Sequence, residues 1–177
     1  NHTVAIRTDG TLWGWGTNMV GELGNGTLSG SSFPTRIGID TTWIAVQSST
    51  IFSAGLKKTK KVLLWGDNTT GQLGNGNNTS QLIPTEITNL SNILRLGLGN
   101  EHSMCIGATG VIYSWGRNNT YQVGNGTQFN TNAPTSLGGA TIGWRQASGG
   151  FAFSVALDGG EIYTWGDNTY GQLGDST

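Results

Sequence analysis

A tryptophan-glycine pair recurs along this chain at an unchanging spacing of fifty residues. The prolines keep the same period, and each of them is followed by threonine. A fixed period of this length indicates stacked supersecondary units that bury their apolar faces against one another. The repeat therefore constrains the architecture more than any other feature of the sequence. The tryptophans are Trp15, Trp65, Trp115 and Trp165, and the prolines are Pro34, Pro84 and Pro134.

One repeat contains several short β-rich runs. In the first copy, residues 2–6 and 11–15 alternate between apolar and polar or small residues and flank an Asp9-Gly10 turn. Glycine accepts the positive φ of a tight turn, so the two runs predict a β-hairpin. Proline in the next run is typical of an edge strand or of a strand's first residue. With no helical period visible, each unit supplies about four short strands, the content of one propeller blade.

Each tryptophan is followed by a glycine-rich loop of the pattern Gly-x-Asn-x-x-Gly-x-Leu-Gly. Asparagine can bond its own backbone, and the glycines allow a compact bend. Tyr121 replaces a glycine of the pattern, so a locally different loop is expected there. One apolar residue per loop is expected to pack onto the core beside the tryptophans. The predicted repeat core comprises Trp15, Leu23, Trp65, Leu73, Trp115, Val123, Trp165 and Leu173.

These motifs resemble the regulator of chromosome condensation repeat family, whose pattern combines a His-Ser-x-Ala-Leu strand, an Asp-Gly turn, an aromatic-x-Trp-Gly strand and an Asn-x-x-Gly-Gln-Leu-Gly loop. Residues 2–24 and 153–174 carry it clearly, although Phe52 and Phe153 stand where the pattern has histidine. The resemblance spans the whole chain and implies an all-β propeller of four-stranded blades, typically seven in number. It also implies a choice of roles, because members serve as guanine-nucleotide exchange factors, ubiquitin-ligase modules, secreted enzyme inhibitors and interaction domains.

The repeats divide the chain into one propeller arc, residues 1–177, of about three and a half blades. The units are approximately 1–27 (a half), 28–77, 78–127 and 128–177. Two such chains would set like halves against like at two junctions, so simple dimerisation does not close a ring. Because an open arc leaves sheet edges unpaired, we expect these residues to be part of a longer polypeptide whose further blades complete a seven-bladed ring.

Composition and motifs argue against several functional classes. Charged residues make up 11% of the chain and the net charge is −1, which favours neither nucleic acid nor an anionic membrane as a partner. No apolar run is long enough to insert as a transmembrane helix. The glycine-rich loops lack the lysine of a phosphate-binding loop. Asp67 and Asp167 share a repeat position that other copies fill with threonine or arginine, so no pair of catalytic carboxylates is indicated.

The two histidines, His2 and His102, occupy equivalent repeat positions. A tetrahedral metal site needs three or four ligands, and phenylalanine fills the same position in the other two copies. A packed or hydrogen-bonded core histidine is therefore favoured over a metal ligand. We predict no catalytic residue, no metal and no cofactor, and hence no enzyme.

Surface recognition is the remaining prediction. The repeat fixes its tryptophan, glycine and leucine positions and leaves other loop positions free to vary. Aromatic anchors among adaptable polar residues suit a protein-binding face, whereas an ordinary solvated loop surface is the alternative. The candidate contact positions are Thr17, Met19, Val20, Asp67, Thr69, Thr70, Arg117, Asn119, Thr120, Tyr121, Asp167, Thr169 and Tyr170.

The leading hypothesis is a non-enzymatic structural or protein-interaction module. Its partner would be another protein or further blades of the same polypeptide, and assembly with other chains is compatible with both. Few lysines and many uncharged polar residues favour an extracellular or virion setting. The alternatives are a regulator resembling an exchange factor for a small GTPase and a secreted enzyme inhibitor of the same fold.

Overall fold

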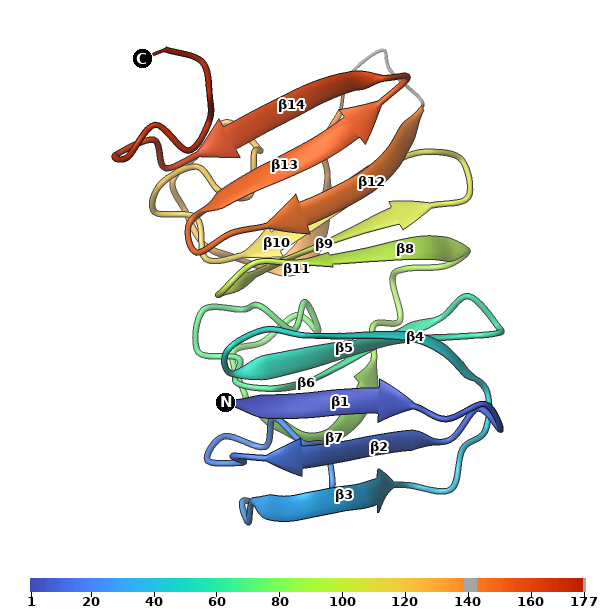
Figure 1. The fold of residues 1–177 in the computed structure, drawn as a ribbon. Helices are drawn as coiled ribbons and strands as arrows, with labels where there is room; N and C mark the ends of the chain where they lie inside the picture. Colours follow the sequence, from blue (N-terminus) through green and yellow to red (C-terminus); the bar gives the residue numbers. More distant parts are fainter. Residues whose placement is uncertain (139–142, 177) are drawn as a thin grey trace.

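The computed structural model describes residues 1–138 and 143–176, and residues 139–142 and 177 of the last predicted repeat lie outside the described part. The all-β expectation is confirmed, since every element in these residues is a strand (Figure 1). No helix among them is long and apolar enough to cross a membrane. The strands are β1 (His2–Ile6), β2 (Leu12–Gly16), β3 (Ser31–Ile37), β4 (Trp43–Ser48), β5 (Phe52–Lys57), β6 (Val62–Gly66), β7 (Gln81–Glu86), β8 (Ile93–Leu98), β9 (His102–Gly107), β10 (Ile112–Gly116), β11 (Thr131–Ser136), β12 (Trp144–Gly149), β13 (Phe153–Asp158) and β14 (Glu161–Gly166).

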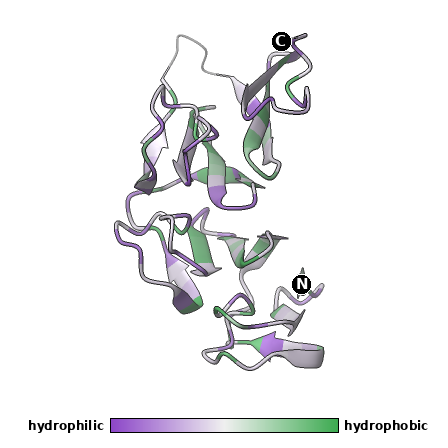
Figure 2. Ribbon diagram, turned by 90° about the vertical axis from the view of Figure 1, so that its left-hand side faces the viewer, coloured by the Kyte–Doolittle hydropathy of each residue, from purple (hydrophilic) through white to green (hydrophobic). Residues whose placement is uncertain are grey.

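The strands form four antiparallel sheets stacked as a partial propeller, as Figures 1 and 2 show. Their orders are β1-β2-β3, β4-β5-β6-β7, β8-β9-β10-β11 and β12-β13-β14. The innermost strands β4, β8 and β12 pack side by side. Within the described residues, the first sheet has no counterpart of β4 and the last has no counterpart of β7. Sheets and sequence repeats are offset, because residues 28–77 supply β3 to the first sheet and β4, β5 and β6 to the second.

The predicted hairpins are confirmed. β1 pairs with β2 in the register Ile6↔Leu12, and β9 pairs with β10 as Ile106↔Ile112. Gly10 and Gly110 take φ values of 80° and 78° at the turns, a conformation that L side chains adopt at a cost. The second copy uses Lys60 at φ 61° in the same turn, so its backbone follows the same path without glycine.

The proline strands β3, β7 and β11 each form an edge of their sheet, which confirms the edge-strand expectation. In the first sheet the register shifts between Gly14 and Gly16, so that Trp15 lies where the ladder with β3 is interrupted. Proline has no N–H to donate to a ladder, and an edge position leaves none unpaired. The same shift recurs in the second and third sheets.

The core lies between the sheets rather than in one centre, with apolar stripes along the facing strands in Figure 2. Trp65 and Trp43 meet edge to face at 6.1 Å between the first and second sheets. Trp65, Trp115, Leu23, Leu73 and Val123 are buried. The terminal members of the predicted core are only half-buried, because they lie where one neighbouring sheet or strand is missing: Trp15, Trp165 and Leu173.

Candidate protein-binding face

The sheets present two different faces at their ends. The glycine-rich loops that follow β2, β6, β10 and β14 open on the same side as the β4–β5, β8–β9 and β12–β13 connections, and we call this side the loop face. Backbone hydrogen bonds join these two kinds of loop, from Asp67 N to Ile51 O (3.0 Å) and from Arg117 N to Glu101 O (2.8 Å). The hairpin tips lie at the opposite ends of the strands, on what we call the turn face. In Figure 1 the loop face is on the left and the turn face on the right.

One buried asparagine holds each glycine-rich loop. The Nδ2 of Asn68 donates to Asn75 Oδ1 (3.1 Å), Asn77 O (2.8 Å) and Thr79 O (3.2 Å), and its Oδ1 accepts from Leu73 N (2.9 Å). The side chain has no exposed surface. The same bonds recur at the equivalent asparagines, Asn18 and Asn118. The loop therefore has a fixed backbone on which the variable positions are displayed.

A loop carbonyl ties each sheet to the next. Trp65 Nε1 and Ser53 Oγ of the second sheet both donate to Glu22 O of the first loop, at 3.0 and 2.9 Å. Gln72 O and Gln122 O accept the same pair of bonds from the sheets that follow them. Sequence reasoning missed this role for the serine, although its recurrence beside the histidine position was the available signal.

The histidines complete two of these junctions. His102 Nε2 lies 2.7 Å from Ser154 Oγ, and His2 Nε2 lies 2.7 Å from Ser53 Oγ. His102 has no exposed surface, so the expected hydrogen-bonded core histidine is confirmed there. Burial lowers the pKa of His102 to about 4 and also lowers that of His2. The Nδ1 atoms of both rings are buried without a partner within the described residues.

These His–Ser pairs have the spacing of a base and a nucleophile but not the access. Ser154 Oγ donates its proton to Gln122 O (2.8 Å), and neither Ser154 nor His102 is exposed. The geometry therefore describes a structural bond between sheets.

The candidate contact positions divide by exposure. Asp67 is 6% exposed and accepts from Gln72 Nε2 (2.6 Å) and Thr69 Oγ1 (2.7 Å), so it belongs to the loop framework. Arg117 pairs with Glu101 beside the loop. Val20, Thr70, Thr120, Arg117 and Asp167 are half-buried. The exposed positions are Thr17, Met19, Thr69, Asn119, Tyr121, Thr169 and Tyr170.

The expectation of a different loop at Tyr121 is wrong. Tyr121 takes φ 65° and its carbonyl accepts from Gly124 N at 2.9 Å, as the carbonyls of Gly21 and Gly71 do in their loops. The Asn118 bonds impose the common backbone, and a left-handed non-glycine residue costs of order 1–3 kcal/mol. At Gly71 a Cβ would lie 2.7 Å from Asn132 Cα of β11. No described outermost strand occupies that space beside Tyr121, so the side chain is tolerated.

Two glycine variants separate backbone strain from this steric contact. Gly71 and Gly171 have φ values of 84° and 75°, but only Gly71 faces a neighbouring strand. Gly71→Ala should lower the free energy of unfolding by about 2 kcal/mol, and Gly171→Ala by about 1 kcal/mol, the cost of the left-handed backbone alone. Urea denaturation of both variants measures the difference, and equal losses would show that β11 yields to the new methyl group.

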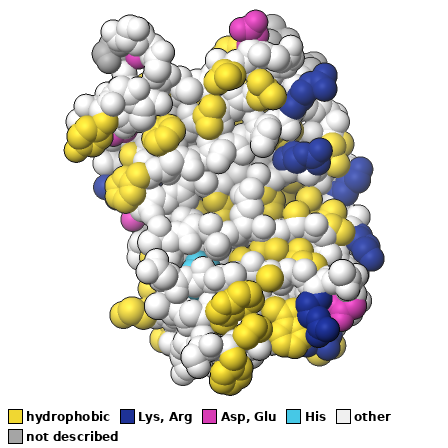
Figure 3. Space-filling model, in the orientation of Figure 1, with side chains coloured by type: hydrophobic (Ala, Val, Ile, Leu, Met, Phe, Trp, Pro, Cys, Tyr) yellow, Lys and Arg dark blue, Asp and Glu magenta, His cyan; other side chains and the backbone are white. Residues whose placement is uncertain are grey.

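Charge is distributed unevenly between the two faces. Figure 3 shows Lys and Arg side chains gathered along the right-hand side, the turn face, and apolar side chains on the left beside the third and fourth sheets. Among the described residues, the loop-face side chains carry a single cation, Arg117. The carboxylates of this face are Glu22, Asp67, Glu101, Asp167 and Asp175.

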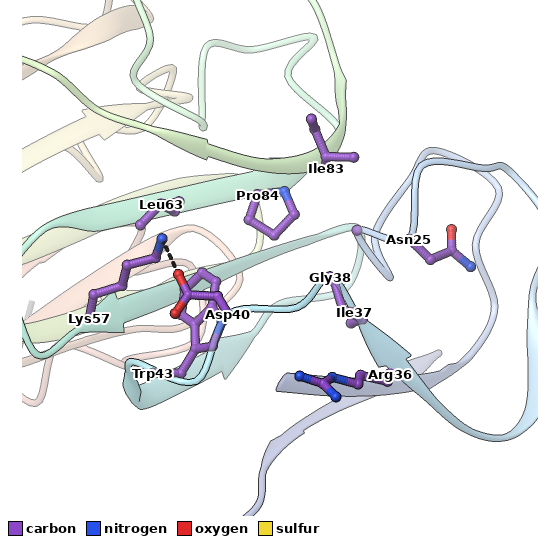
Figure 4. Close-up of a pocket in the computed structure, with 11 residues that line it drawn as sticks. Asn25, Arg36, Ile37, Gly38, Asp40, Trp43, Lys57, Leu63, Ile83 and Pro84 are labelled. Carbon is purple, nitrogen blue, oxygen red and sulfur yellow. Dashed lines mark ion pairs between the residues drawn. The ribbon is translucent and has the colours of Figure 1, made fainter. Parts of the chain in front are cut away.

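A cleft of about 370 Å³ lies between the first two sheets, at the outer edge of the turn face (Figure 4). Lys57 Nζ pairs with Asp40 Oδ2 at 2.6 Å and lies over the ring of Trp43. The hydrogen bond from Lys57 lowers the pKa of Asp40 to about 2. Arg36 Nη2 donates to Ile39 O (3.1 Å). Because both cations already have partners, the cleft works as a joint between sheets rather than as an evident ligand site.

The fold and motifs define a repeat-built propeller protein. Residues 9–56, 61–106, 109–157 and 159–177 each match the regulator of chromosome condensation (RCC1) repeat, so the chain belongs to this family. No curated protein sequence matches it.

Several solved structures share the fold. Prp20p of Saccharomyces cerevisiae, described with its binding to Gsp1p and histones, superposes with a TM-score of 0.81 at 23% identity over 88% of this chain and 41% of its own. Human WBSCR16 gives 0.82 at 21% identity over 93% and 44%. The ectodomain of the receptor kinase CR4 of Physcomitrella patens gives 0.59 at 20% identity over 94% and 38%. The chain thus spans less than half the length of each, and identities this low show the fold alone.

Proposed function

We propose that the chain is a non-enzymatic protein-interaction module that binds a partner protein through its loop face. The observation that carries this proposal is the combination of a fixed loop backbone with variable, exposed side chains. Met19 and Tyr170 are 81% and 91% exposed on loops that buried asparagines hold in place. Rigid aromatic and methionine side chains lose little conformational freedom on binding, which suits them as anchors.

The proposed partner is a protein rather than a nucleic acid. Phosphate contacts need lysine and arginine, and the loop face has one arginine, already paired with Glu101. A structural role in a larger assembly is the same proposal in another setting, with further blades or other chains as the partner. An extracellular or virion location remains part of the proposal and is supported by composition, since lysine and arginine together number 9 in 177 residues.

Capture experiments with matched variants test the binding face. A loop-face variant combines Met19→Ser, Tyr121→Gly and Tyr170→Ser, and a turn-face control combines Ile39→Ser and Lys58→Ser. All five positions are exposed, so both variants should fold. Loss of a hot-spot anchor typically costs about 2 kcal/mol, so the loop-face variant should retain proteins from its native source at least about tenfold more weakly. A loss confined to the turn-face control would contradict the proposal.

A further inference from the structure

The chain contains three Asn-Gly pairs at equivalent loop positions, and their surroundings differ in one respect. The pairs begin at Asn25, Asn75 and Asn125. Asn-Gly is the sequence in which an asparagine side chain is most open to attack by the following backbone nitrogen, because glycine has no side chain to obstruct it. The reactivity of each pair then depends on whether the fold restrains that nitrogen.

The next sheet restrains the first two glycine nitrogens. Gly26 N donates to Leu82 O of β7 at 2.9 Å, and Gly76 N donates to Asn132 O of β11 at 2.8 Å. Such a bond holds the proton on the nitrogen and fixes the peptide plane. Gly126 N has no hydrogen-bond partner among the described residues, where β14 has no outermost strand beyond it. Gly124 is also exposed, whereas its counterparts Gly24 and Gly74 are buried.

The first and third pairs are otherwise closely matched. Both stand in the sequence Gly-Asn-Gly-Thr. Asn25 Oδ1 accepts from Asn18 Nδ2 at 3.1 Å and from Thr27 N at 3.0 Å. Asn125 Oδ1 accepts the equivalent bonds at 2.9 and 3.1 Å. The following glycines have φ values of 81° and 78°. The restraint on the glycine nitrogen is therefore the main local difference between them.

We propose that Asn125 is a site of spontaneous deamidation, selected among the three Asn-Gly pairs by the unrestrained nitrogen of Gly126. Gly126 N loses its proton to solvent base and attacks Asn125 Cγ, forming a C–N bond of a cyclic succinimide. The side-chain nitrogen takes up a proton and leaves as ammonia. Water then adds to one of the two succinimide carbonyls and breaks its bond to nitrogen, giving an aspartyl or an isoaspartyl residue. One water is consumed and one ammonia released, with no oxidation or reduction.

The fourth repeat indicates how the loop accommodates the aspartyl product. Its counterpart of Asn125 is Asp175, whose Oδ1 accepts from Asn168 Nδ2 at 2.9 Å. An aspartate at position 125 can therefore keep the bond from Asn118 while adding a negative charge to the loop face. The isoaspartyl product lengthens the backbone by a methylene group and would displace Thr127 N from its acceptor. The modification does not depend on which partner the loop face binds.

The test compares Asn125 with Asn25 in the folded, full chain at mildly alkaline pH. Peptide mapping by mass spectrometry, with chromatographic separation of aspartyl and isoaspartyl peptides, gives both rates from one sample. Asn125 should react about fivefold faster, the rate factor for loss of one ordinary hydrogen bond. In urea the two rates should converge, because their sequence neighbours match. Equal rates in the folded protein, or a faster reaction at Asn25, would overturn the proposal.

Amide hydrogen exchange tests the premise separately from the chemistry. The Gly126 N–H should exchange at least about fivefold faster than the Gly26 N–H, which β7 protects. If Gly126 is protected as strongly as Gly26, the structural basis of the proposal is wrong. The variant Asn125→Asp should keep the melting temperature of the parent chain, as the Asp175 loop leads us to expect, and a large loss would contradict the proposed tolerance of the aspartyl product.

Discussion

Replacing Asn68 by alanine is expected to lower the free energy of unfolding by about 3 kcal/mol. The variant removes four hydrogen bonds from a side chain with no exposed surface, and Leu73 N is left buried without a partner. A buried polar group without a partner costs about 1–3 kcal/mol, and the lost bonds to Asn77 O and Thr79 O add to this. Urea denaturation measures the change, with an unchanged m-value as evidence that the folded state is retained.

Asn168→Ala is the matched control. Asn168 Oδ1 accepts from Leu173 N at 3.0 Å, as in the buried copies, but the residue is only half-buried. Water can reach the groups that the variant exposes, so the expected loss is about 1 kcal/mol. Equal losses at the two positions would mean that burial of the asparagine does not set the strength of the loop.

Acid is expected to destabilise the protein through His102 between pH 6.5 and pH 4. The folded-state pKa is about 4 and the ordinary value is 6.5. Between these values the unfolded chain binds a proton that the folded chain does not, so stability is fully present above pH 6.5 and falls as the pH is lowered. The difference corresponds to a loss of up to about 3 kcal/mol at the lower limit.

His102→Phe separates this effect from the titration of carboxylates. Phenylalanine already occupies the equivalent position as Phe52 and Phe153, and Ser154 keeps its bond to Gln122 O. The variant should lose stability less steeply than the parent chain between pH 6.5 and pH 4, as measured by urea midpoints at each pH. The same slope in both proteins would show that the buried ring is not the group that responds to acid.

The architecture follows from the sequence because its determinants are local and repeated. The Asp9-Gly10 turn, the proline on an edge strand and the buried Trp65 are each consequences of one residue's backbone or side-chain preference. Repetition at a fixed period then makes the stacking of sheets predictable. The bonds between sheets could not be predicted in the same way. Trp65 Nε1 and Glu22 O are 43 residues apart and meet only because of how one sheet docks on another.

Tyr121 shows where a local rule failed. Glycine in three copies suggests that the position requires glycine for its left-handed backbone, but the structure gives it a second role. Gly21 and Gly71 also admit the next sheet's outermost strand, and a Cβ at Gly21 would lie 2.6 Å from Leu82 Cδ2. The backbone cost is small enough for the Asn118 bonds to overcome, whereas the steric requirement depends on a neighbour that the motif does not reveal.

Site-specific photo-cross-linking tests the proposed binding face most directly. A photoreactive residue is placed at Met19, Tyr121 or Tyr170 on the loop face, and at Ile39 or Lys58 on the turn face, in the protein in its native source. We expect covalent adducts with the same partner protein from the loop-face positions and none from the turn face. Adducts only from the turn face, or from neither face, would contradict the assignment of the loop face as the site of protein interaction.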